Sequence, residues 1–266
     1  MKRRSFVKSS LLTGTLASIA PMITSAAGME NKKDKDRQFY ELRVYTLKDA
    51  TQQQLVEDYL KNAAIPALNK IGSKNVGVFT EVKPEGQTKL YVLIPYSTIN
   101  DFLEANEKLS KDATYMSAAD AYLNAPATAP AYVRIEKSLL HAFTGFPKLV
   151  TPPQNARIFE LRRYESPSEA AAKKKIEMFN DAGELAIFKR TGLRGVFFGE
   201  SLTGEMLPNL TYMLTYNDMA EHDQNWKTFG TDAEWKKLSG MPEYADAKII
   251  SKITAIFLQP TSFSQV

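Results

Sequence analysis

Two short stretches of the sequence repeat a set of side chains that could bind or transform a small molecule. Residues 38–46 read QFYELRVYT and residues 157–165 read RIFELRRYE, so Glu-Leu-Arg-x-Tyr occurs twice, 119 positions apart. The repeated polar residues are Glu41, Arg43 and Tyr45 in the first stretch and Glu160, Arg162 and Tyr164 in the second. In a pocket, the arginine could hold a carboxylate or an enolate, the glutamate could act as a base and the tyrosine could donate a proton. The alternative is structural: each glutamate and arginine form an ion pair between neighbouring strands, and the tyrosine hydroxyls complete the network.

Other chemistry has little support in the sequence. The chain has no cysteine, which excludes disulfides, thiolate metal ligands and cysteine nucleophiles. It has two histidines, His141 and His222, and no His-x-x-x-His motif. A histidine could be the axial ligand of a haem, but a lone histidine is more often a surface or capping residue. We therefore expect no metal and no cofactor.

An aromatic tract lies in the last quarter of the sequence. It contains Trp226, Phe229, Trp235 and Tyr244. Such residues commonly pack between helices and a sheet. They could also line the mouth of a pocket for a flat organic ligand. On this second interpretation Trp235 joins the two Glu-Arg-Tyr triplets as a candidate ligand contact.

Strand alternation predicts where the triplets point, because successive side chains of a strand face opposite ways. Leu42 and Val44 should share one face, and the Glu-Arg-Tyr residues the other. We expect the leucines to pack on helices and the triplets to face the interior of a barrel. In the second stretch Arg163 takes the place of Val44, which predicts a less buried outer face there.

The repeated motif is one of four matches that keep their order along the chain. The other three pair Asn75–Phe79 with Leu193–Phe197, Leu90–Leu93 with Leu210–Leu214, and Asp112–Tyr115 with Asp232–Trp235. Chance similarity rarely keeps its order over such a distance, so we infer two copies of one unit. The predicted domains are a first unit at 38–139, a linker at 140–156 and a second unit at 157–259.

The hydrophobic periodicity, helix caps and turns of each copy predict the order βαββαβ. The first copy should have strands at 40–45, 76–82, 89–94 and 132–139, and helices at 50–71, 97–109 and 112–123. The second should have strands at 158–164, 194–200, 210–216 and 249–258, and helices at 168–191, 219–229 and 233–238. Pro66 should kink or divide the first helix. This order is the ferredoxin-like pattern of an α+β fold, whose sheet keeps one bare face. Two such sheets can bury each other as an eight-stranded barrel with helices outside.

The sequence resembles the NIPSNAP family of the dimeric α/β-barrel superfamily. The resemblance rests on both Glu-Leu-Arg-x-Tyr motifs, the Gly-Val-Phe strands and Asp232-Ala233-Glu234-Trp235, which is close to the family's Asp-Pro-Glu-Trp. The first copy departs from the pattern, since Tyr115 stands where a tryptophan is usual. The resemblance implies a fold more than a function. Neighbours in the superfamily include cofactor-free monooxygenases and haem enzymes.

The first 27 residues have the composition of a secretory signal. Basic residues are followed by the uncharged stretch Ser9–Ala20 and then by Thr24–Ala27, a small-residue cleavage site. The pair Arg3-Arg4 with the following Ser-Phe-Val-Lys resembles the twin-arginine export signal. We therefore expect a bacterial, periplasmic protein, with 28–37 as a flexible leader.

The charge balance argues against a nucleic-acid partner. Four of the 34 basic residues lie in the predicted signal, and the remaining 30 balance 30 acidic residues. A neutral mature chain has no electrostatic footprint for a phosphate backbone. No run of 18 apolar residues follows residue 28, so no membrane span is expected after signal removal.

Two functional hypotheses from different classes remain. The first is a small-molecule barrel, similar to a monooxygenase by analogy with the superfamily, which binds and could transform an organic compound. The second is a non-catalytic interaction or scaffold protein with a filled barrel, in line with eukaryotic family members discussed in trafficking and signalling. A lumen of a few hundred cubic ångströms would favour the first hypothesis. A homo-oligomer is compatible with either.

Overall fold

The structure is a computed structural model that describes residues 36–155 and 157–266. The predicted signal, its cleavage site and most of the predicted leader lie outside these residues. Within the described ranges, every helix is too short or too polar to span a bilayer.

Both halves of the chain follow the predicted order of elements. The first half contains β1 (Phe39–Leu47), α1 (Ala50–Tyr59), the π-helical turn η1 (Leu60–Ala64), α2 (Ile65–Lys70), β2 (Gly77–Glu81), β3 (Thr88–Tyr96), α3 (Ile99–Ser110), α4 (Ala113–Ala118), α5 (Asp120–Leu123) and β4 (Arg134–Ala142). The second contains β5 (Ile158–Glu165), α6 (Glu169–Asn180), α7 (Glu184–Arg190), β6 (Arg194–Thr203), β7 (Asn209–Tyr216), α8 (Met219–Thr231), α9 (Ala233–Ser239), α10 (Asp246–Ile249) and β8 (Lys252–Pro260).

The eight strands form one closed antiparallel barrel in the order β1-β3-β2-β8-β5-β7-β6-β4. Each half contributes four neighbouring strands, and two pairings join the halves. Strand β2 pairs with β8, from Phe79 opposite Pro260 to Glu81 opposite Leu258. Strand β4 pairs with β6, where His141 lies opposite Glu200. The predicted α+β fold with an eight-stranded barrel is confirmed.

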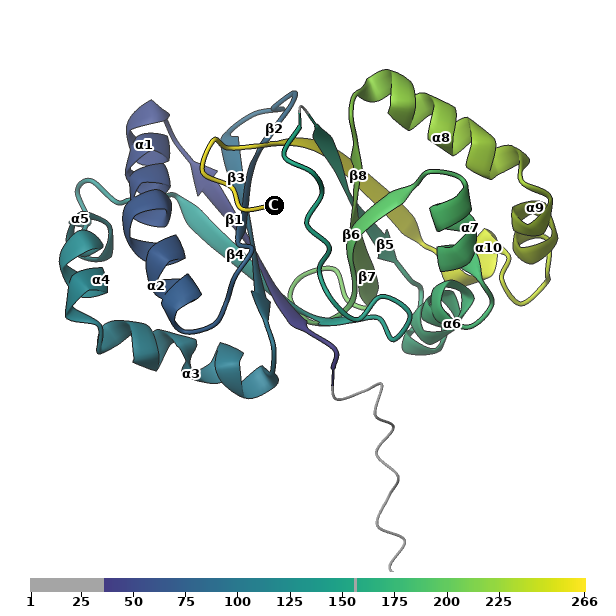
Figure 1. Cartoon of the computed structure of the whole chain (residues 1–266), viewed down its shortest axis with the longest axis horizontal. Helices are drawn as coiled ribbons and strands as arrows, with labels where there is room; N and C mark the ends of the chain where they lie inside the picture. Colours follow the sequence, from purple (N-terminus) through teal and green to yellow (C-terminus); the bar gives the residue numbers. More distant parts are fainter. Residues whose placement is uncertain (1–35, 156) are drawn as a thin grey trace, which may run out of the picture. The chain divides into compact units, whose positions relative to one another are not determined.

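Three separate apolar clusters hold this arrangement together. One packs α1–α5 against the first four strands, and a second packs α6–α10 against β5, β6 and β7. Figure 1 shows the two groups of helices beside the strands of their own halves. The third cluster fills part of the barrel lumen with residues of both halves, including Leu42, Phe79, Leu161 and Phe197. Both faces of the sheet are therefore buried over most of its strands, whereas β8 exposes Ile253 and Ala255 on its outer face.

Some element boundaries differ from the sequence-based expectation. The helix expected at 50–71 is divided by the π-helical turn η1, and Pro66 lies in the first turn of α2, where a missing N–H is tolerated. The helix expected at 168–191 is interrupted before α7, which begins after Gly183 at φ 99°. Strand β4 continues to Ala142, into the range expected for the linker, so His141 is a strand residue that stacks on Phe39.

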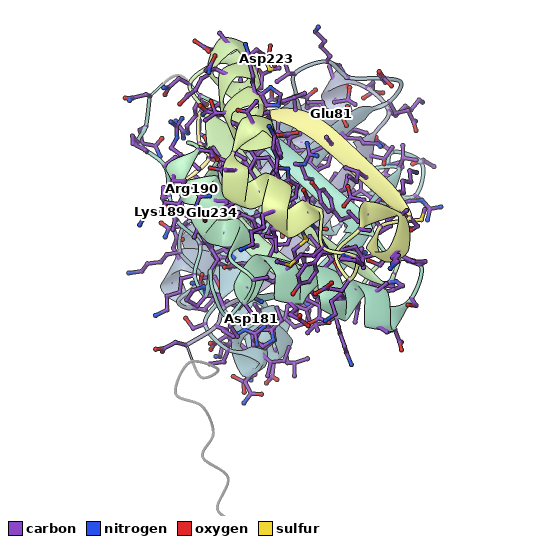
Figure 2. The ribbon with its side chains drawn as sticks, turned by 90° about the vertical axis from the view of Figure 1, so that its right-hand side faces the viewer. Glu81, Asp181, Lys189, Arg190, Asp223 and Glu234 are labelled. Atoms are coloured by element: carbon purple, nitrogen blue, oxygen red, sulfur yellow. The ribbon has the colours of Figure 1, made fainter. Side chains whose placement is uncertain are left out.

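The Asp-Ala-Glu-Trp motif begins α9 and holds it to α7. The Asp232 carboxylate accepts a hydrogen bond from the Trp235 backbone N–H and caps the helix. It also accepts from Arg190 Nη2 at 2.6 Å, while Arg190 Nη1 donates to Glu234 at 2.7 Å, and Figure 2 shows Arg190 and Glu234 side by side. The Arg190 hydrogen bonds lower the pKa of Asp232 to about 2. In the first half Asp112 caps α4 and pairs with Lys70 in the same way.

Candidate functional site

The Glu-Arg-Tyr triplets lie between the sheet and the helices, and not in the barrel lumen. Tyr45 belongs to the cluster under α1–α5, and Tyr164 to the cluster under α6–α10. Leu42 and Leu161 occupy the lumen instead. The predicted orientation was therefore wrong, although the division into two faces was right. Since both faces of the sheet are buried, alternation alone could not show which of them faced the helices.

In the second half Glu160 is the centre of a buried hydrogen-bonded network. One carboxylate oxygen accepts from Arg162 Nη1 on the same strand. The other accepts from Tyr216 Oη at 3.1 Å and from Trp226 Nε1 at 3.0 Å. His222 Nε2 lies 3.5 Å from the same oxygen. Three side chains thus donate to one carboxylate that is 1% exposed, and His222 lies beside it.

The histidine of this network was not predicted as a site residue. His222 lies on α8 with a side chain that is 15% exposed, and its ring packs edge-on against Tyr216 and Phe257. Its Nδ1 lies 2.8 Å from Asp223 Oδ1. Its place on the same helix as Trp226, one turn earlier, is the only sequence signal that could have linked it to the motif.

In the first half Glu41 has a related but smaller set of partners. Arg43 donates to both of its oxygens, from Nε at 2.6 Å and from Nη2 at 2.8 Å. Tyr96 Oη donates at 3.2 Å, and Lys137 Nζ lies 3.4 Å away. Burial raises the pKa of Glu41, but Arg43 and Lys137 more than offset this, so the pKa lies below its usual value. Glu41 is therefore an ionised acceptor at neutral pH.

The two tyrosines and Trp235 complete the predicted set at separate places. Tyr45 Oη lies 3.1 Å from Tyr122 Oη, within a group of tyrosine rings. Tyr164 Oη accepts from Tyr212 at 3.0 Å and from Arg162 Nη2 at 3.2 Å. Trp235 packs on Phe229 with a centroid distance of 4.3 Å. The structure thus joins all three residues of the second triplet and joins Glu41 to Arg43 in the first, and the Trp235 ring lies on the aromatic core of the second half.

The lumen itself contains a cavity, as the small-molecule hypothesis expected, but its lining does not include the predicted triplets. Its volume is about 260 Å³, just below the roughly 300–1,000 Å³ of typical small-molecule pockets. Seven of the eight strands or their connections line it. Leu42, Leu161 and Ile256 supply an apolar wall, and the polar lining includes Lys89, Glu136, Arg163, Glu205, Thr211 and Thr254.

Arg163 is the feature that distinguishes the two halves of this cavity. It lies opposite Thr211 on β7 and Thr254 on β8, and all three line the lumen. At the matching place in the first half, Val44 lies opposite Tyr91 and Glu136. Arg163 was expected on a less buried outer face, and that expectation was wrong because its strand face is the lumen side.

Two polar atoms among the neighbouring residues Arg163, Thr211 and Thr254 have no hydrogen-bond partner. Arg163 Nη2 lies 3.2 Å from Glu165, but Arg163 Nε and Thr254 Oγ1 are buried without a hydrogen-bond partner. Tyr91, in contrast, donates to Glu81 at 2.6 Å, and burial raises the pKa of its hydroxyl. A buried donor without an acceptor is unfavourable unless a ligand or water satisfies it.

The fold and the two buried networks define a class of protein. A closed barrel made of two βαββαβ halves is a dimeric α/β barrel in which both halves are on one chain. The chain belongs to the NIPSNAP family, because the family model described as NIPSNAP matches residues 40–131 and 159–265. No curated protein sequence matches the chain.

Solved structures are similar to this chain in fold. A "putative monooxygenase" from Lactobacillus acidophilus is 10% identical with a TM-score of 0.54, covering 84% of this chain and 94% of its own. A protein of the same description from Fusobacterium nucleatum is 14% identical with a TM-score of 0.52, covering 84% and 92%. A NIPSNAP family protein from Agrobacterium tumefaciens is 18% identical with a TM-score of 0.36, covering 41% and 96%.

Proposed function

We propose that this protein is exported and binds a small organic molecule with an anionic head group in the barrel lumen. The cavity of about 260 Å³ carries the proposal, because a filled lumen would have favoured the scaffold hypothesis. Its apolar wall at Leu42, Leu161 and Ile256 suits a hydrocarbon body. The Arg163 Nε–H and the Thr254 hydroxyl, both without partners, suit a carboxylate or enolate oxygen.

Replacing Arg163 by valine tests this proposal. The substitution places in the second half the residue that the first half has at Val44, so the fold should persist. A charge-assisted hydrogen bond contributes about 1.5–3 kcal/mol, which corresponds to a loss of roughly 10–150-fold in affinity. Benzoate, which has a flat apolar body and one carboxylate, is a suitable probe in isothermal titration calorimetry of the mature protein.

The control is Arg134→Val, which removes the same charge from an exposed position of β4 outside the cavity lining. It should bind benzoate as the wild type does. Equal affinities for the wild type and Arg163→Val, or no binding of benzoate by the wild type, would contradict the lumen as the binding site.

The export part of the proposal rests on Arg3 and Arg4 and has its own test. Changing both to lysine keeps the charge and removes the twin-arginine pair, so the protein should remain in the cytoplasm of its bacterial host. Cell fractionation followed by immunoblotting measures this. Lys8→Arg leaves the pair intact and should leave export unchanged. Periplasmic protein from the double lysine variant would rule out the twin-arginine route.

A further inference from the structure

The two helices that cover the buried glutamates can be compared residue by residue. Helix α3 follows the N-cap Thr98, and helix α8 follows the N-cap Asp218. An acidic residue stands third in each helix, Asp101 in α3 and Glu221 in α8. On this alignment Asn106 and Trp226 are both the eighth residue of their helix.

Trp226 occupies the space beside Glu160 in the second half. Its indole Nε1–H donates to Glu160 Oε2 at 3.0 Å. The centre of the Arg162 guanidinium lies 4.5 Å from the centroid of its ring. The side chain is thus a planar aromatic group with one N–H donor, seated between a carboxylate acceptor and a cation.

The first half has the matching glutamate, arginine and tyrosine but lacks the ring, and Arg43 donates to both oxygens of Glu41. Glu41, Arg43 and Tyr96 correspond to Glu160, Arg162 and Tyr216, and Phe102 packs edge-on against Tyr96 as His222 does against Tyr216. Asn106 is short and exposed.

A cavity of about 230 Å³ lies at this place in the first half. Its lining includes Glu41, Tyr96, Phe102, Asn106 and Lys137. The Glu41 side chain is 4% exposed, so a deeply buried carboxylate forms part of the wall. Residues Lys137 and Ser138 also line the lumen cavity, but the remaining walls of the two cavities are different.

We propose that the cavity beside Glu41 binds a planar aromatic molecule with a ring N–H or a phenolic O–H, which donates to the Glu41 carboxylate as Trp226 donates to Glu160. The second half thus presents, as part of its own chain, the ring that the first half takes from solution. Lys137 has Ala255 as its counterpart, since these two residues lie opposite Arg43 and Arg162. Its half-exposed ammonium group at the rim can contact an acceptor on the ligand.

Indole is the appropriate probe, because it is the side chain of Trp226 without its backbone. The mature protein should bind indole in isothermal titration calorimetry, and 1-methylindole, which has no N–H, should bind at least about tenfold more weakly. Asn106→Trp should fill the cavity from within and abolish indole binding while the protein stays folded. Arg163→Val, which alters only the lumen, should bind indole as the wild type does.

Trp226→Ala provides the positive control, because indole should fill the space that the deleted ring leaves beside Glu160. If this variant does not fold, amide chemical shifts of Leu103, Asn106 and Thr203 in the wild type locate the bound indole instead. Wild-type protein that binds no indole would overturn the proposal. So would an Asn106→Trp variant that binds indole unchanged, or equal affinities for indole and 1-methylindole.

Discussion

Replacing Glu184 by leucine is expected to lower the free energy of unfolding by about 3–5 kcal/mol, because it leaves the Lys175 ammonium group buried without its counter-ion. Lys175 Nζ lies 2.9 Å from Glu184 Oε2, and the two side chains are 1% and 2% exposed. The rings of Tyr164, Phe179 and Trp235 surround the ammonium group at 4.8–5.7 Å and can offset only part of the loss.

The double variant Lys175→Met/Glu184→Leu should recover this stability and could exceed that of the wild type. An apolar pair of similar volume avoids the desolvation of two charges. Burial raises the pKa of Glu184, which shows the cost of ionising it there. The first half already uses an apolar residue: Val56 is the seventh residue of α1, as Lys175 is of α6, and it is fully buried.

Urea unfolding followed by circular dichroism measures the free energy of unfolding of the wild type, Glu184→Leu and the double variant. A single variant as stable as the wild type would mean that water reaches Lys175. A double variant no more stable than Glu184→Leu would mean that the ion pair itself stabilises the packing of α6 on α7.

Glu160→Leu is expected to be similarly destabilising, by about 3–5 kcal/mol, because several buried donors lose one acceptor together. Arg162, Tyr216 and Trp226 all donate to this carboxylate. Burial and the Glu160 carboxylate raise the pKa of the Tyr216 hydroxyl, so this hydroxyl stays protonated and needs an acceptor.

Glu160→Gln is the matched control, since it keeps the size of the side chain and one acceptor oxygen but removes the charge. Its loss of stability should lie between those of the wild type and Glu160→Leu in the same urea experiment. A Glu160→Leu protein of unchanged stability would contradict a structural role for the repeated motif in the second half and would return the glutamate to the catalytic candidates.

The barrel could be predicted from the repeat, because four ordered matches and the βαββαβ pattern leave few other ways to bury two bare sheets. The direction in which the Glu-Arg-Tyr side chains point could not be predicted from the sequence. Leu42 and Glu41 are both buried in the structure, so a strand with two buried faces has no solvent side to mark its direction. The charged side chains of the strand have hydrogen-bond partners on the helices, such as Trp226 for Glu160. These partners are known only from the three-dimensional structure.

The two cavities were visible in the sequence only as differences between the copies. Arg163 against Val44 can be read from the aligned motifs, but its meaning depends on which face of β5 meets the lumen. Asn106 against Trp226 lies outside the four matches, and the helix caps at Thr98 and Asp218 are needed to align it. The sequence therefore shows that the two copies differ at these positions. Only the strand register and the rotation of the helices show that the differing residues line cavities.

The pairings β2–β8 and β4–β6 connect two halves that are covalently linked. Closure of the barrel is consequently unimolecular, and its melting temperature should not fall on dilution as that of a barrel assembled from two chains would. A two-chain barrel with identical subunits receives every mutation twice, on both sides of its symmetry axis. In this chain a mutation occurs in one half only, so one half can change while the packing of the other stays as it is.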